Sequence, residues 1–123
     1  DVVPLRWQTD SVEYVQRAAP AGMARASTST PRARLKELRG PPEMYEALVH
    51  VPEDARGPMP LLLYLHGAGE MQGDVRDMLS EGATGTPMVE LQFGRAVPML
   101  AARFVVVAPH TQRGWARSAI CKY

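Results

Sequence analysis

Two short apolar runs, each bounded by turn-forming residues, most constrain the fold. They are residues 61–65 (LLLYL) and residues 104–108 (FVVVA), the second closed by Pro109. Five residues are too few for a helix, and uninterrupted apolar runs of this length are typical of strands buried on both faces, as in a parallel sheet. Between them, residues 89–103 have roughly helical apolar spacing, with Pro98 expected to shorten or kink the helix. This order of elements predicts a parallel α/β sheet.

Weaker strand patterns precede these runs. Residues 45–51 (YEALVHV) are rich in β-branched and aromatic residues and end at Pro52, which predicts a further strand. Residues 11–17 alternate weakly between apolar and polar side chains. With residues 34–39, they are candidate short edge strands.

The first 40 residues differ in composition from the remainder. Residues 1–40 contain seven basic and four acidic residues, whereas residues 41–123 contain seven and nine. No acidic residue lies between Tyr14 and Lys36, a stretch that includes Ser27 and Ser29. We expect residues 1–40 to be an extended or irregular basic segment, followed by one domain over residues 41–123. An Arg-rich, Ser-rich, acid-poor composition suggests an organellar transit peptide, for a plastid or mitochondrion, with a basic linker as the alternative.

Charge and cysteine content exclude several classes of function. The net charge of +1 gives no electrostatic footprint for nucleic acid. No apolar run approaches the ~20 residues needed to span a bilayer. Cys121 is the single cysteine, and histidines 16 and 44 residues apart show no metal-ligand pattern. We therefore expect no nucleic-acid partner, no membrane span, no metal and no cofactor.

A glycine-rich loop directly follows residues 61–65. It reads His-Gly-Ala-Gly-Glu at residues 66–70, with another glycine at Gly73. Glycines at the carboxyl end of a strand let backbone N–H groups point into a cleft. The spacing misses Gly-x-Gly-x-x-Gly by one residue, and the loop lacks the Gly-Lys-Ser/Thr ending of a phosphate-binding P-loop. The remaining interpretation is an oxyanion hole for acyl transfer.

Residues 61–74 (LLLYLHGAGEMQGD) resemble the third strand and oxyanion loop of α/β-hydrolases, most closely the esterase and phospholipase/carboxylesterase-like branch. Residues 104–110, followed by Gly114 and Trp115, resemble the next strand of that branch, and the intervening Gly-x-Pro at residues 85–87 also fits. The resemblance covers about residues 45–116.

The resemblance implies a partial α/β-hydrolase-like parallel sheet of few strands. It also implies an oxyanion-hole loop formed by His66, Gly67, Ala68 and Gly69, in which the histidine ring supports the turn. Glu70 is then a capping or ion-pairing residue of the loop.

The catalytic residues of that family have no counterpart in the chain. The family nucleophile lies in Gly-x-Ser-x-Gly, and Ser80, Ser118 and Cys121 all lack this context. The family acid and histidine follow the nucleophile, beyond the position matched by Tyr123. We therefore expect no catalytic residue within the chain, and no enzyme activity from the chain alone.

Two functions of different classes follow. The first is a catalytically inert, truncated hydrolase-like module, acting as an accessory or structural subunit of a larger protein assembly. The alternative is the N-terminal half of a serine carboxylesterase-type hydrolase, whose nucleophile, acid and histidine lie beyond residue 123. A third interpretation is a small binding protein that uses the glycine loop for an anion.

The same reasoning predicts a protein partner. In the family pattern the glycine-loop strand is flanked by the following strand and by the nucleophile strand, and the latter is missing. The strand at residues 61–65 then has an unpaired edge, and one helix covers only one face of the sheet. We expect other protein chains to cover the strands at residues 61–65 and 104–108.

Overall fold

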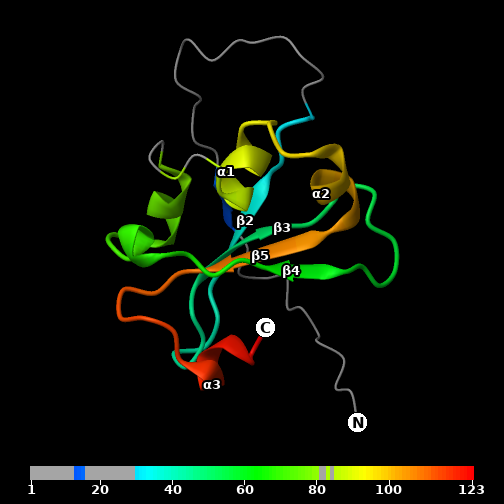
Figure 1. Ribbon diagram of the computed structural model, residues 1–123. Coiled ribbons are helices and arrows are strands. Elements are labelled where there is room, and N and C mark those ends of the chain that lie inside the picture. The colour runs from blue at the N-terminus through cyan, green and yellow to red at the C-terminus, as the bar shows by residue number, and fades with distance from the viewer. Residues whose placement is uncertain (1–12, 16–29, 81–82, 84) are drawn as a thin grey trace.

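The computed structural model describes residues 13–15, 30–80, 83 and 85–123. Within these ranges the chain forms one mixed sheet with short helices on its faces (Figure 1). Residues 1–12 and 16–29, most of the segment expected to be irregular, lie outside the described residues. The strands are β1 (Glu13–Val15), β2 (Leu35–Leu38), β3 (Ala47–His50), β4 (Leu61–Leu63) and β5 (Val105–Pro109). The helices are α1 (Pro87–Gln92), α2 (Pro98–Arg103) and α3 (Arg117–Ile120), with 3-10 helices η2 (Ala68–Glu70) and η3 (Val75–Leu79).

The sheet has the strand order β1-β2-β3-β5-β4, and only β4 and β5 are parallel. The remaining neighbours pair antiparallel. The expected parallel sheet is therefore a mixed sheet. Residues 39–46 join β2 to β3, and so short a connection permits only antiparallel pairing. Between β4 and β5 the chain is long enough to carry α1 and α2, as a parallel crossover requires.

The two apolar runs have different environments. The strand expected at residues 104–108 is confirmed as β5, in which Val106, Val107 and Ala108 have no exposed surface. The expectation of burial on both faces is wrong for residues 61–65, because β4 lies at the edge of the sheet and Leu61 is 49% exposed. A central strand has neighbours on both sides, whereas an edge strand is shielded on one.

The other expected strands are confirmed. Residues 45–51 contain β3, and residues 34–39 contain β2. The expectation that residues 34–39 form an edge strand is wrong, because β2 lies between β1 and β3. Residues 11–17 contain β1, which lies at the opposite edge of the sheet from β4. Weak alternation was thus a sufficient signal for these short strands.

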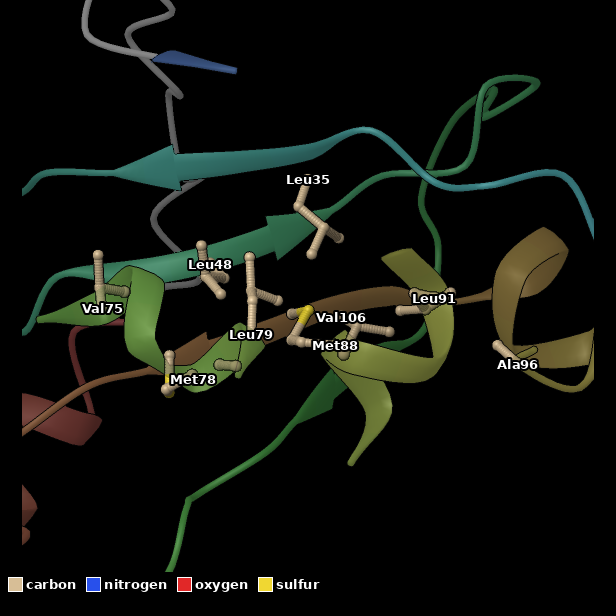
Figure 2. Close-up of a cluster of buried hydrophobic side chains, with 10 residues drawn as sticks. Leu35, Leu48, Val75, Met78, Leu79, Met88, Leu91, Ala96 and Val106 are labelled. Atoms are coloured by element: carbon tan, nitrogen blue, oxygen red, sulfur yellow. The ribbon is translucent and has the colours of Figure 1, made fainter. Parts of the chain in front are cut away.

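The main core lies between one sheet face and the helices α1 and η3. Figure 2 shows Met88 of α1 and Leu79 of η3 directed toward Leu48 and Val106 of the sheet. The opposite face carries a smaller cluster centred on Ala47, Val49 and Val107, against which Tyr123 packs after α3. Alternation of side chains along β3 and β5 sends neighbouring residues to opposite faces. Each of these strands therefore contributes to both clusters.

The helix expected over residues 89–103 is two helices. Gly94, which follows α1, has a φ of +70°, and a Cβ there would lie 2.4 Å from the carbonyl oxygen of Thr30. Pro98 begins α2, where its missing N–H has no intrahelical acceptor to lose. A left-handed glycine and a proline therefore divide one periodic pattern. The expectation of a single covering helix is wrong.

Ion pairs to a buried carboxylate, with half-exposed arginines as partners, join the sheet to η3. The side chain of Glu37 is 2% exposed and lies between two guanidinium groups. The Nη2 of Arg39 is 2.7 Å from one carboxylate oxygen, and the Nε of Arg76 is 2.9 Å from the other. None of the described helices is long and apolar enough to cross a membrane.

Candidate functional site

The glycine loop and the loop after β5 meet at the carboxyl ends of β4 and β5. The glycine loop begins immediately beyond the carboxyl end of β4, and residues 110–116 follow the carboxyl end of β5. Because β4 and β5 are parallel neighbours, their carboxyl ends lie side by side. Ligand sites of α/β sheets lie at these carboxyl ends. Hydrogen bonds between histidine side chains and backbone groups join the two loops.

His66 lies between the two loops, is 3% exposed and bonds to both of them. Its Nδ1 lies 2.9 Å from the carbonyl oxygen of Gly67, and its Nε2 lies 3.1 Å from the backbone nitrogen of Thr111. A carbonyl only accepts and a backbone N–H only donates, so Nδ1 carries the proton and Nε2 accepts. Both ring nitrogens are occupied. His66 thus holds the two loops together and has no nitrogen available as a general base.

Aromatic rings surround this histidine. The ring of Trp115 lies 4.7 Å from that of His66, and the indole Nε1–H donates to the His66 carbonyl at 3.3 Å. The ring of His110, the first residue after β5, lies 5.2 Å from that of His66. Its Nε2–H donates to the Glu70 carbonyl at 3.0 Å. The resulting cluster gives the loop several fixed points of attachment.

Tyr45 secures the far end of the second loop. Its hydroxyl donates to the Gly114 carbonyl at 3.0 Å and accepts from the Ala116 backbone N–H at 2.7 Å. Its ring meets Trp115 edge to face, with centroids 5.4 Å apart. The loop that supports His66 is therefore attached to the residues leading into β3.

The backbone of Gly67, Ala68 and Gly69 is exposed at the surface of this cluster. A Cβ at Gly67 or Gly69 would meet no atom within 4 Å, and the φ of Gly67 is −85°. The glycines are thus not required by a left-handed turn here. Their effect is to leave the backbone open to close approach by another group.

The carboxylate of Glu70 accepts a hydrogen bond from one backbone N–H of the glycine loop. The Gly67 N–H donates to its Oε2 at 3.2 Å, so this carboxylate caps the start of η2. The Tyr64 hydroxyl lies 3.3 Å from the same oxygen, and burial together with the Glu70 charge raises the pKa of Tyr64. Glu70 is therefore a capping residue, as the sequence predicted. The N–H groups of Ala68 and Gly69 stand at the start of η2, where a helix has no intrahelical acceptor for them.

A cavity of about 610 Å³ lies beside the loop and is lined by Gly69, Glu70, Gly73, Asp77 and Ser80, among others. The Asp77 Oδ2 accepts from the Asp74 N–H at 2.8 Å, so this carboxylate caps η3. No histidine lines the cavity, and no nucleophile is paired with a base among the residues that the structure describes.

The remaining sequence candidates are not part of this site. His50 lies at the end of β3, the other end of the sheet. Ser118 and Cys121 are exposed on and after α3. In the described part of the chain, no cluster of three His, Cys, Asp or Glu side chains could hold a metal ion. Thr111 and Tyr45 were missed by sequence reasoning, because one acts through its backbone and the other through a contact across 69 residues.

Comparison of the chain with protein-family models, with curated proteins and with solved structures finds no match in any of the three.

Proposed function

We propose that the chain forms the oxyanion-loop part of an α/β-hydrolase-like esterase module that acts only within a larger protein assembly. The observation that carries this proposal is the exposed position of Ala68 and Gly69 at the start of η2, after the carboxyl end of β4 and beside a cavity. Fixed backbone donors of this kind stabilise the oxyanion of an acyl-transfer reaction. The parallel pairing of β4 with the following strand, β5, also supports the proposal.

The chain by itself is inert in this proposal. An oxyanion loop stabilises developing charge but supplies neither a nucleophile nor a base. The ring nitrogens of His66 are both engaged, and Ser80 has no histidine beside it in the cavity. The missing groups come from protein outside residues 1–123.

The open edge of β4 is where that protein would attach. Leu61 is 49% exposed and Leu65 is 40% exposed, and an edge strand offers unpaired backbone groups for strand addition. A strand added here would end next to the glycine loop. The added strand belongs either to another chain, in which case this chain is an accessory subunit, or to the same polypeptide beyond residue 123.

Recovery of the native polypeptide with an antibody against residues 41–123 tests the proposal. Intact mass and labelling by a fluorophosphonate, which reacts with activated serines, are measured on the recovered material. We expect a labelled serine in the assembly and none on the 123-residue chain alone. A mass near 13.5 kDa identifies the accessory subunit, and about twice that mass identifies the continuous hydrolase. Labelling or saturable ester hydrolysis by the isolated chain contradicts the proposal, as does an assembly without a reactive serine.

A further inference from the structure

A second groove lies at the end of the sheet opposite the glycine loop. It has a volume of about 900 Å³, and residues 30–36, the turn after β3 and helix α2 form its walls. In Figure 1, α2 lies near the end where β5 begins, whereas the glycine loop follows the other end of β4. The groove is therefore separate from the candidate oxyanion loop and has no part in the proposed function.

His50 lines this groove and has an unused nitrogen. The residue is 5% exposed, and its Nε2 lies 2.8 Å from the carbonyl oxygen of Ala101 in α2. That carbonyl can only accept, so Nε2 carries the proton and Nδ1 is a bare acceptor. Nδ1 is buried and has no hydrogen-bond partner. Burial lowers the pKa of His50, although the bond to Ala101 opposes this, so the ring is neutral near pH 7.

Two arginines stand on one wall. Arg32 and Arg34 are exposed, lie two residues apart just before β2, and both line the groove. Among the described residues, neither guanidinium has a hydrogen bond or an ion pair. Guanidinium groups bind planar anions through paired N–H donors.

Two acidic residues limit the charge of a ligand. Glu53 and Asp54 also line the groove and would repel a second negative charge. Pro52, Pro98 and Ala102 provide apolar surface between the charged groups. The groove thus favours one anionic group with an apolar body over a compact dianion such as phosphate.

We propose that this groove binds an organic monocarboxylate, with the carboxylate at Arg32 and Arg34, and that His50 Nδ1 takes up a proton when it binds. The proton comes from solvent. In the bound form Nε2–H still donates to Ala101, and the charge of the nearby carboxylate stabilises the imidazolium. Without the anion, burial disfavours an imidazolium at this position, and the negative charge of a carboxylate in the groove opposes that effect.

Calorimetric titration of the full chain with hexanoate near pH 7 tests the proposal. It is repeated in two buffers of different ionisation enthalpy, with hexan-1-ol and inorganic phosphate as comparison ligands at constant ionic strength. We expect saturable binding of hexanoate, weaker binding of the other two, and uptake of about one proton per hexanoate. Equal affinity for hexanol overturns the role of the charge, and binding without proton uptake overturns the role of His50. Absence of hexanoate binding overturns the whole proposal.

Matched variants locate the site. The double variant Arg32→Gln/Arg34→Gln changes exposed side chains and is expected to weaken hexanoate binding about tenfold or more. Arg56→Gln removes an exposed arginine outside the groove and is expected to leave the affinity unchanged. Equal loss in both variants would mean non-specific attraction and would contradict the assignment. All of these measurements are independent of esterase function.

Discussion

The imidazole of His66 accepts a hydrogen bond from the backbone N–H of Thr111, at 3.1 Å, across 45 residues of sequence. This bond joins the loop after β4 to the loop after β5 and fixes the tautomer of the ring. His66→Ala would leave the buried Thr111 N–H without its acceptor and open space beside Trp115. We expect a loss of about 2–4 kcal/mol in the free energy of unfolding, measured by urea denaturation.

His66→Gln is the matched control for this position. Its side-chain carbonyl is able to accept from Thr111, so we expect a smaller loss than for His66→Ala. Equal losses in the two variants would show that packing against Trp115, and not the hydrogen bond, dominates.

Removal of a single loop donor tests the oxyanion role in the native assembly. Ala68 is the first residue of η2 and follows an extended Gly67, with φ −85° and ψ −178°. Proline is tolerated at the first helical position and after an extended residue, so Ala68→Pro removes the N–H with little change in fold. We expect kcat for ester hydrolysis to fall about 10²–10³-fold, whereas Ala68→Ser leaves it near the original value. Full activity of the proline variant would exclude this N–H as a donor.

The ion pair at Glu37 predicts a pH dependence of stability. Burial raises the pKa of Glu37, but the hydrogen bonds and charges of Arg39 and Arg76 outweigh it, so the pKa lies below its ordinary value. The contribution of this carboxylate is thus present above its unfolded pKa and is lost as the pH falls through the folded value. We expect Glu37→Gln to destabilise the chain by about 1–3 kcal/mol at pH 7. The difference from wild type should shrink at acid pH, and exposed Glu46→Gln should show no such trend.

Gly94 is required by both its conformation and its close approach to Thr30. Gly94→Ala adds a Cβ at 2.4 Å from a backbone oxygen, with φ at +70°. Gly57→Ala places a Cβ at a similar φ of +73° with no atom within 4 Å. We expect Gly57→Ala to cost about 1 kcal/mol and Gly94→Ala distinctly more, in thermal or urea unfolding. Similar losses would mean that the backbone near Thr30 moves without strain.

The β4 edge predicts association. Leu61→Lys places a charge on the exposed edge strand and is expected to weaken assembly with the partner, or self-association of the purified chain, without unfolding it. Met99→Lys, at a more exposed apolar residue of α2, is the control and should leave association unchanged. Sedimentation velocity of the three proteins distinguishes these outcomes. A wild-type chain that is monomeric at micromolar concentration and has no native partner would contradict the prediction.

Local patterns were sufficient to predict most strands and the position of the glycine loop, but not the neighbours of each strand. Apolar runs at residues 61–65 and 104–108 look alike, yet only the second lies in the middle of the sheet. Burial depends on strand order, which arises from contacts between distant residues. The break at Gly94 was similarly hidden, since it depends on the Thr30 carbonyl, 64 residues earlier.

The candidate site shows the same division. His66 and residues 67–69 were found from composition and spacing, because glycines after a strand are a local signal. The groove lined by Arg32 and His50 was not found, because three segments distant in sequence form it. The burial of His50 could not be predicted locally, because its ring nitrogen is bonded to the carbonyl of Ala101, 51 residues later in the chain.

The strand register also orders the steps by which this chain folds. Leu38 pairs with Ala47, nine residues away, whereas Leu61 pairs with Val105, forty-four residues away. The loss of chain entropy on closing the longer loop costs about 1.4 kcal/mol more free energy than on closing the hairpin. We therefore expect the β2–β3 hairpin to form early and β4 to pair with β5 late. Because His110 and Thr111, which follow β5, hold the glycine loop against the rest of the site, we expect it to become organised late. A chain still emerging from the ribosome therefore lacks this loop geometry until residues past Trp115 are free to fold.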